Sequence, residues 1–285
     1  MTDGRGFRGF NINRVTQNSR ATSGSIIPNR QEINVKAIFF SLCIFAVSGS
    51  SLAASTPSFQ PYLASALADP ARASDVAIDA RRKPGEIIAF SGAKPGDEVV
   101  DLIPGSGYFT RIFSKVVGPK GQVYMIWPNE YAKMAHSDAE NGRALAASPE
   151  YGNITVIQQP AAAFATPEPM DLVFTSQNYH DYPDKFMGNV DPLSFDRAVY
   201  KALKPGGVFL IVDHVAEAGS GMRDTDTLHR IDPAIVKQQL LQTGFIFEGE
   251  SSVLRNPADD HHKRVFDQSI RGYTDRFIYK FRKPQ

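Results

Sequence analysis

The sequence predicts an α/β fold, with a mostly parallel seven-stranded sheet covered by helices on both faces. Short β-branched runs alternate with helical segments from residue 84 onward, a pattern typical of parallel strands joined by crossover helices. Residues 98–110 pass from an apolar run through the turn Ile103-Pro104-Gly105-Ser106-Gly107 into a helix. In α/β folds, a small-residue turn in this position can hold a nucleotide-like ligand against bare backbone. An ordinary strand-to-helix turn that uses glycine for its φ angles is the alternative.

Composition and charge describe an ordinary globular chain. The 285 residues are 42% hydrophobic and 21% charged, with a formal net charge of +1. A chain of this length can bury a full core, and we expect one domain over residues 55–285. The near-neutral charge gives no reason to expect a nucleic-acid partner.

The first 54 residues differ from the rest. Residues 1–34 are rich in Gly, Asn, Arg and Ser and have no apolar period, which is typical of disorder. Lys36 then precedes the apolar run 37–47 and a stretch of small residues, the pattern of a signal peptide. We expect export to the periplasm or the medium, cleavage near Ala54 or Ser55, and no stable membrane anchor afterwards. A buried or interfacial helix is the alternative reading of the apolar run.

A signal peptide that begins near residue 35 makes the leading segment unusual. One explanation is that translation starts at Val35, so that residues 1–34 are a gene-start artefact. The single cysteine, Cys43, lies in the part that cleavage would remove. The mature chain would then have no thiol, which suits an oxidising compartment.

The remaining elements follow from local patterns. Turns at Asp69-Pro70 and Lys83-Pro84 divide the helical segment 55–94. We predict strands at 98–102, 122–127, 154–158, 172–175, 208–212, 245–247 and 276–281. We predict helices at 108–117 and 130–147, and two more that open with Asp191-Pro192 and Asp232-Pro233. An aspartate N-cap followed by proline in the first turn is a strong helix start.

Four motifs in this order resemble the class I S-adenosylmethionine-dependent methyltransferases. They are Val99-Val100-Asp101-Leu102 with the glycine turn, residues 117–124, Asp171-Leu172-Val173, and Leu203-Lys204-Pro205-Gly206-Gly207. The similarity covers about residues 84–284 and is closest to a poorly characterised branch of predicted exported methyltransferases. It implies a Rossmann-like methyltransferase fold and methyl transfer from S-adenosylmethionine to a small molecule. A dinucleotide-binding fingerprint would have a third glycine where Thr110 stands, so a dehydrogenase is disfavoured.

The resemblance also implies where the cofactor binds. In that family the glycine turn approaches the methionine part of the cofactor, and the acid of the first strand orients it. The residues of this sequence that we assign to the cofactor are Asp101, Ile103, Gly105, Gly107, Tyr108, Glu130 and Asn178. Two positions depart from the family: Ile103 replaces a glycine, and Trp127 replaces the acid that binds the ribose hydroxyls. Glu130 is the nearest substitute for that acid.

Candidate catalytic groups follow two neighbouring strands. Residues 177–182 come after the strand at 172–175, and Asp213-His214 come after the strand at 208–212. Because the carboxyl ends of parallel strands meet at one edge of a sheet, we expect His180, Asp181 and His214 to lie together there. His180 is our candidate general base, and His180→Ala should then lower turnover about a hundredfold or more. Capping or hydrogen bonding within the loop is the alternative for each residue.

Two polar connections, 219–229 and 251–275, are expected to cover the same edge. Several histidines and carboxylates gather there, but no spacing matches a known ligand pattern, so we expect no metal site.

A second function remains open. S-adenosylmethionine is made in the cytoplasm, and export would separate the enzyme from it. An exported ligand-binding protein, or an enzyme of other chemistry that kept the fold with a remodelled pocket, is the alternative. Ile103 and Trp127 favour it.

Overall fold

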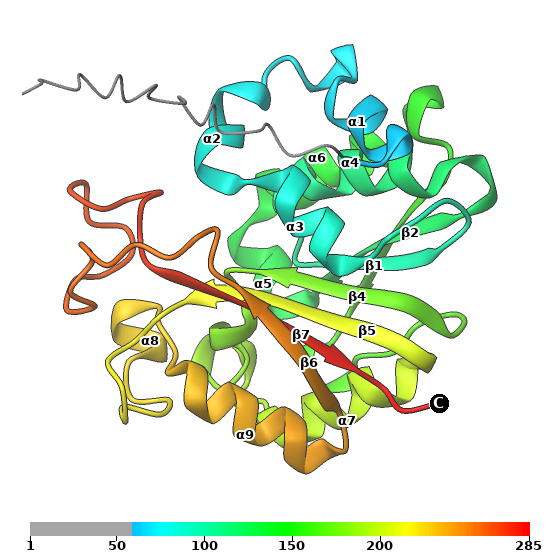
Figure 1. The fold of residues 1–285 in the computed structure, drawn as a ribbon. Coiled ribbons are helices and arrows are strands. Elements are labelled where there is room, and N and C mark those ends of the chain that lie inside the picture. The colour runs from blue at the N-terminus through cyan, green and yellow to red at the C-terminus, as the bar shows by residue number, and fades with distance from the viewer. Residues whose placement is uncertain (1–58) are drawn as a thin grey trace, which may run out of the picture. The chain divides into compact units, whose positions relative to one another are not determined.

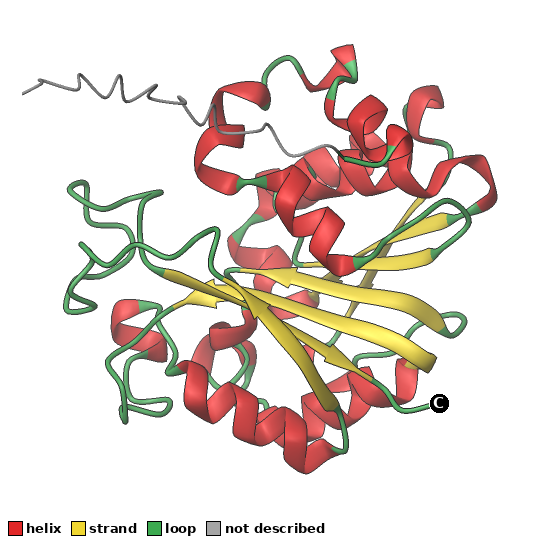
Figure 2. Cartoon of the chain, in the orientation of Figure 1, coloured by secondary structure: helices red, strands yellow, loops and turns green. Residues whose placement is uncertain are grey.

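A seven-stranded sheet organises the chain (Figure 2). The structure is a computed structural model that describes residues 59–285, so the leader and signal peptide lie outside the described residues. The strand order is β3-β2-β1-β4-β5-β7-β6. The strands are β1 (Glu98–Leu102), β2 (Gln122–Pro128), β3 (Ile154–Gln159), β4 (Met170–Ser176), β5 (Leu203–His214), β6 (Ile246–Ser251) and β7 (Arg276–Arg282). β7 runs antiparallel to β5 and β6, and the other neighbouring strands pair in parallel, which confirms the predicted sheet.

Helices cover both faces of this sheet (Figure 1). On one face lie α1 (Pro61–Leu67), α3 (Pro84–Ser91) and α4 (Tyr108–Val117), and on the other α7 (Pro192–Ala202) and α9 (Pro233–Thr243). The shorter or peripheral helices are α2 (Asp79–Arg82), α5 (Asn129–Met134), α6 (His136–Ala146) and α8 (Thr225–Leu228). Within residues 59–285, every helix is too short or too polar to cross a bilayer.

The Asp-Pro pairs start helices as predicted. Asp191 accepts a hydrogen bond from the Ser194 amide at 3.0 Å and caps α7. Asp232 accepts one from the Ala234 amide at 2.9 Å and caps α9. The predicted helix at 130–147 is interrupted, because Ala135 leaves helical geometry (φ −100°, ψ 44°) and separates α5 from α6. This interruption changes which side chains reach the edge of the sheet.

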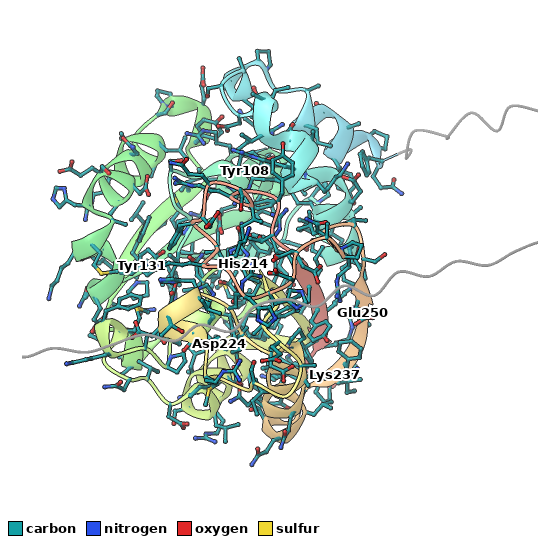
Figure 3. The ribbon with its side chains drawn as sticks, turned by 90° about the vertical axis from the view of Figure 1, so that its left-hand side faces the viewer. Tyr108, Tyr131, His214, Asp224, Lys237 and Glu250 are labelled. Atoms are coloured by element: carbon teal, nitrogen blue, oxygen red, sulfur yellow. The ribbon has the colours of Figure 1, made fainter. Side chains whose placement is uncertain are left out.

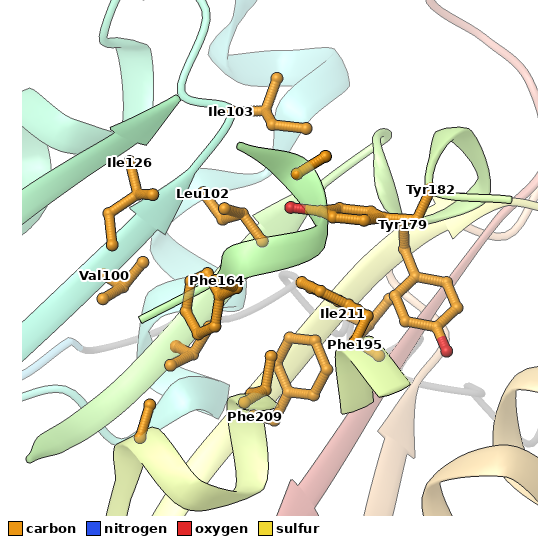
Figure 4. Close-up of a cluster of buried hydrophobic side chains, with 14 of the residues drawn as sticks. Val100, Leu102, Ile103, Ile126, Phe164, Tyr179, Tyr182, Phe195, Phe209 and Ile211 are labelled. Atoms are coloured by element: carbon orange, nitrogen blue, oxygen red, sulfur yellow. The ribbon is translucent and has the colours of Figure 1, made fainter. Parts of the chain in front are cut away.

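The core consists of two apolar layers, one on each face of the sheet. Alternate residues of a strand supply the two layers: Val99 packs toward α4, and Val100 packs toward α7. Figure 4 shows part of the layer beneath α7, where the rings of Tyr182 and Phe195 stack at 3.8 Å. Burying a side chain of this size contributes about 1.5–3 kcal/mol. The apolar layers therefore hold the carboxyl ends of β1, β4 and β5 rigidly in place.

Candidate functional site

A cavity of about 310 Å³ lies at the carboxyl ends of β1 and β4, and we call it the turn pocket. Five of the predicted cofactor residues line it, namely Asp101, Ile103, Gly105, Tyr108 and Asn178. They come from a strand end, a turn, a helix start and the loop after the neighbouring strand. The parallel sheet brings these elements to one edge, as the sequence predicts.

Asp101 is the buried acid of the turn pocket. Its side chain is 2% exposed and accepts a hydrogen bond from Thr110 Oγ1 at 2.6 Å. Burial raises the pKa of Asp101 to about 7, while the Thr110 hydrogen bond and the charge of Arg82 act in the opposite direction. A cationic ligand beside this carboxyl group would therefore favour its ionised form near neutral pH.

Ile103 has the backbone conformation that glycine adopts easily. Its φ is +53°, a region that costs a β-branched residue about 1–3 kcal/mol. The Ile103 amide donates to Ile126 O at 2.9 Å, and Asn178 Nδ2 donates to Ile103 O at 3.1 Å. The side chain is 4% exposed and belongs to the core layer of Figure 4. These contacts hold the turn in the shape that a glycine would give it.

The two glycines of the turn have different surroundings. Gly105 has φ +57°, and no atom lies within 4 Å of the position that a Cβ would take. Gly107 has φ +85° and precedes α4, and a Cβ there would come within 2.6 Å of Leu145 Cδ2. Gly105 therefore borders open space in the turn pocket, whereas Gly107 is needed for packing between α4 and α6.

Glu130 does not lie where we predicted. Its carboxylate accepts a hydrogen bond from the Ala161 amide at 2.9 Å, and it is not among the residues that line the turn pocket. Trp127 is 1% exposed and packs against Tyr131, so it does not reach the pocket either. The second acid of the turn pocket is Asp138, in the first turn of α6.

The sequence contains a signal for Asp138 that we did not use. Tyr131, Ala135 and Asp138 all line the turn pocket and are spaced by four and then three residues, as on one face of a helix. Arg82 also lines the pocket, with its guanidinium 4.4 Å from the Tyr108 ring centroid. Its segment lies far ahead of the glycine turn, so no local pattern links the two.

His180 and His214 lie at the same edge as predicted, with ring centroids 6.0 Å apart, but His180 belongs to a buried ion-pair cluster. Its Nδ1 lies 2.8 Å from Asp213 Oδ1, and its Nε2 lies 3.2 Å from Asp181 Oδ1. Burial alone would lower the pKa of His180, but the charges of Asp213 and Asp181 outweigh it and raise the pKa well above 6.5. The ring is 2% exposed and lines neither of the two cavities at this edge. It is therefore protonated near neutral pH and enclosed.

The same cluster contains a group of possible metal ligands. His180 Nε2, Asp181 Oδ1 and His229 Nδ1 lie within 4.8 Å of one another. His180 also pairs with Asp213, and Arg264 Nη2 lies 3.0 Å from His229 Nε2. The ion pairs account for this geometry, and the expectation of no metal site stays a prediction.

His214 lines a second cavity of about 400 Å³ at the same edge. Figure 3 shows His214 near the middle of this edge, below Tyr108. We call this cavity the arginine pocket, because Arg81, Arg82, Arg271 and Arg276 line it. Arg82 also lines the turn pocket, so the two cavities adjoin. Along the loop after β4, Ser176 and Asn178 face the turn pocket and Gln177 faces the arginine pocket.

His214 differs from His180 in charge. Its Nδ1 lies 2.8 Å from Thr274 Oγ1, and Nε2 has no hydrogen-bond partner in residues 59–285. Burial lowers the pKa of His214 well below 6.5, and the positive charges of His180, Arg276 and Arg230 lower it further. His214 is therefore neutral near pH 7 with one free nitrogen at the cavity wall, and the burial and cations that lower its pKa make it a weak base.

Part of the long connection lies at this edge, as expected, and the two polar connections are also bound to each other. Arg230 is fully buried and pairs with Asp259 at 2.9 Å. The Val265 amide donates to Leu228 O at 3.2 Å. These contacts join the segment after β5 to the segment before β7. They fix the part of the long connection that forms one wall of the arginine pocket.

Curated proteins with similar sequences are quinone-biosynthesis methyltransferases. The ubiquinone/menaquinone biosynthesis C-methyltransferase UbiE of Vibrio cholerae is 31% identical over 201 residues, which are 68% of this chain and 64% of that protein. UbiE of Pasteurella multocida is 32% identical over 127 residues, which are 44% of this chain and 43% of that protein. The chain thus matches less than two thirds of the length of these relatives. No family model matches the chain.

Solved structures give the same fold. A SAM-dependent methyltransferase from Aquifex aeolicus superposes with a TM-score of 0.51 at 21% identity, over 79% of this chain and 99% of that one. The [4+2]-cyclase SpnF superposes with a TM-score of 0.52 at 16% identity, over 72% of this chain and 80% of that one. The described chain has the Rossmann-like fold of the class I S-adenosylmethionine-dependent methyltransferases, which confirms the predicted fold class. The assignment to an exported branch stays a prediction.

Proposed function

We propose that the protein is an enzyme that transfers a methyl group from S-adenosylmethionine to a small molecule. The observation that carries this proposal is the turn pocket, a cavity between the glycine turn and Asp101 in a chain with the methyltransferase fold. The sequence similarity to UbiE supports the reaction type. When bound, the cofactor supplies the methyl group, and the protein has to hold it in line with the acceptor.

The residues of the turn pocket suit such a cofactor. S-adenosylmethionine carries a positively charged sulfonium and an amino group, and Asp101 supplies a carboxylate that ionises near neutral pH. Asp138 takes the role that we first gave to Glu130, because it is the second acid of the pocket and its oxygens can accept hydrogen bonds from ribose hydroxyls. Asn178 positions the turn, since its amide donates to Ile103 O.

We assign the general base to His214 in place of His180. His180 is protonated and enclosed, so it cannot accept the proton of an acceptor. His214 is neutral and lines the cavity that adjoins the turn pocket, although its lowered pKa makes it a weaker base than a free imidazole. With Nδ1–H donating to Thr274 Oγ1, the Nε2 lone pair takes the proton that an oxygen or nitrogen nucleophile releases during transfer. His180 and Asp213 then act as positioning residues, because Asp213 also accepts the His214 amide at 2.7 Å.

Cofactor binding is tested best at Gly105. Gly105→Val should weaken the binding of S-adenosylhomocysteine at least about tenfold, since its side chain would fill open space in the turn pocket. Gly221→Val is a matched control: Gly221 has φ +58°, its Cβ position is also open, and it lines neither cavity. Calorimetry measures the affinities, and circular dichroism checks the fold. Equal affinity in Gly105→Val and wild type would refute the assignment of the pocket.

We also propose that the protein is exported, as the pattern at residues 36–55 indicates. Protein purified from the native host should begin near Ala54 or Ser55 and accumulate outside the cytoplasm. Mass spectrometry of the N-terminus after cell fractionation measures both. An intact leader on cytoplasmic protein would contradict export and would place the enzyme where the cofactor is made.

Two observations support a second function. The [4+2]-cyclase shows that this fold is not confined to methyl transfer, and Trp127 stands at the end of β2 in place of an acid. A binding protein or an enzyme of other chemistry would retain the fold with a remodelled pocket. Failure of the folded wild-type protein to bind S-adenosylhomocysteine would favour this alternative.

A further inference from the structure

The arginine pocket gathers guanidinium groups from segments that are far apart in the sequence. Arg81 and Arg82 belong to α2, and Arg271 and Arg276 belong to the end of the long connection and the start of β7. Figure 1 shows α2 and this connection on the same side of the sheet edge. Such a concentration of positive charge at one cavity requires a compensating negative charge.

Carboxylates of the described chain compensate this charge only from beyond ion-pair distance: Asp101 and Asp75 act on Arg82, and Asp275 acts on Arg276. Across residues 59–285, none of the four arginines forms an ion pair, although Arg230 and Arg255 nearby pair with Asp259 and Asp275. Arg276 is only 5% exposed, and its Nε has no hydrogen-bond partner in the described chain. Burial, together with the charges of Arg82 and Arg81, lowers the pKa of Arg276 to about 10. A buried cation beside two others is stable only if something else neutralises it.

An oxyanion fits the free donors. A phosphate or carboxylate accepts paired N–H bonds from guanidinium groups, which are planar and present their donors in a fixed fork. Arg276 Nη2 donates one hydrogen bond to Arg81 O at 2.8 Å, and Nε is buried without a partner in the described chain. Arg82 also has an Nε without a partner in the described chain and lines both cavities.

Part of the arginine pocket is apolar, although Gln177 and His214 also line it. Ile78, Val265 and Phe266 line it, and the Phe266 ring is 51% exposed. An aromatic ring that borders a cationic cavity gives a flat surface for the organic part of a ligand. A small ligand with an apolar body and one oxyanion group would match both parts of the wall.

We propose that the arginine pocket binds the oxyanion group, a phosphate or carboxylate, of the methyl acceptor, with the apolar part of the acceptor against Phe266. The assignment to an acceptor rests on the proposed function, and the binding of an oxyanion does not. Arg82 joins the pocket to the cofactor side, and His214 stands in its wall. The acceptor would thus lie beside the group to which we assign its proton.

Calorimetry with phenyl phosphate, benzoate and inorganic phosphate tests the pocket. Wild type should bind phenyl phosphate or benzoate more tightly than inorganic phosphate, and whichever aryl anion binds better identifies the oxyanion. Arg271→Gln and Arg276→Gln should each weaken that binding at least about tenfold, because each removes a charged donor. Arg197→Gln is the control, since this arginine lies on α7 with its side chain 59% exposed. Equal affinity in all four proteins, or no binding of any anion by wild type, would overturn the proposal.

Thermal unfolding separates binding from folding. Arg276→Gln should unfold at a temperature no lower than wild type without ligand, because it removes a buried charge with like-charged neighbours. It should lose the rise in Tm that phenyl phosphate gives to wild type. A lower Tm with the rise retained would assign Arg276 a structural role and contradict the proposal. Anion binding without S-adenosylhomocysteine binding would uphold the pocket and refute methyl transfer separately.

Discussion

His180 and His214 show how position on one sheet edge sets the charge of an imidazole. Both rings are buried, yet the pKa of His180 is raised and that of His214 is lowered. The difference comes from the partners: His180 contacts two carboxylates, whereas His214 contacts a hydroxyl and lies among cations. A protonated ring between two acids holds the loop in place, and a neutral ring at a cavity wall keeps a nitrogen free, although its lowered pKa makes it a weak base.

Substitution should separate these roles. His214→Gln should lower turnover at least about a hundredfold and leave the affinity for S-adenosylhomocysteine within about twofold of wild type. His180→Gln should destabilise the fold by about 3–5 kcal/mol, because it leaves Asp213 and Asp181 buried without their cation. Single-turnover assays with an acceptor and urea denaturation measure the two effects. A stable His180→Gln protein that has lost turnover alone would return the base to His180.

The aspartates that cap α7 and α9 differ in the segments to which they are hydrogen-bonded. Asp191 is exposed and serves its own helix, with one bond to the Ser194 amide and one to the Ser194 hydroxyl. Asp232 is 5% exposed and also accepts the Gly219 amide at 2.8 Å. It therefore joins α9 to the connection after β5.

Replacing the two capping aspartates should lower the free energy of unfolding by different amounts. Asp191→Ala should destabilise the protein by about 1 kcal/mol, which is typical of an N-cap. Asp232→Ala should cost about 2–3 kcal/mol, because it also leaves the Gly219 amide without its acceptor. Asn at either position keeps an acceptor and should recover most of the loss. Equal losses in urea denaturation of the two alanine variants would show that the second bond contributes nothing.

For the whole molecule, the buried titratable groups predict how stability depends on pH. Burial raises the pKa of Asp101 to about 7 and that of Asp196 to about 8, and the pKa of His180 is also raised. In each case the folded state holds its proton to a higher pH than the unfolded state does. Stability from such a group is complete below the unfolded pKa and is lost as pH rises through the folded pKa.

We therefore expect the protein to become less stable between pH 6.5 and pH 8. In that window, the raised pKa of Asp196 and that of His180 each lower the free energy of unfolding by about 1.4 kcal/mol per pH unit. The raised pKa of Asp101 lowers it further up to about pH 7. His214 acts in the opposite direction only below 6.5, where its lowered pKa costs stability as the pH falls. Thermal unfolding across this range measures the slope, and Asp196→Asn should reduce it. A Tm that is constant or rises toward pH 8 would contradict these protonation states.

Local patterns in the sequence were sufficient for the sheet, the Asp-Pro helix starts and much of the turn pocket. Strands and caps depend on residues close together in the chain, so β-branched runs and Pro or Gly positions predict them. Asp101, Gly105 and Asn178 reach one cavity because parallel strands end at the same edge. The break at Ala135 was missed because tertiary packing overrode the helical pattern, whereas the spacing of Tyr131, Ala135 and Asp138 could have favoured Asp138 over Glu130.

Only the tertiary structure decided the charges of the site. His180 meets Asp213 across 33 residues, and Arg82 and Arg276 meet at one cavity from opposite ends of the described chain. A pKa depends on burial and on neighbouring charges in space, and neither is a property of a local segment. The sequence by itself therefore determined the fold and the edge where ligands would bind. Packing determined which histidine is neutral and where positive charge accumulates.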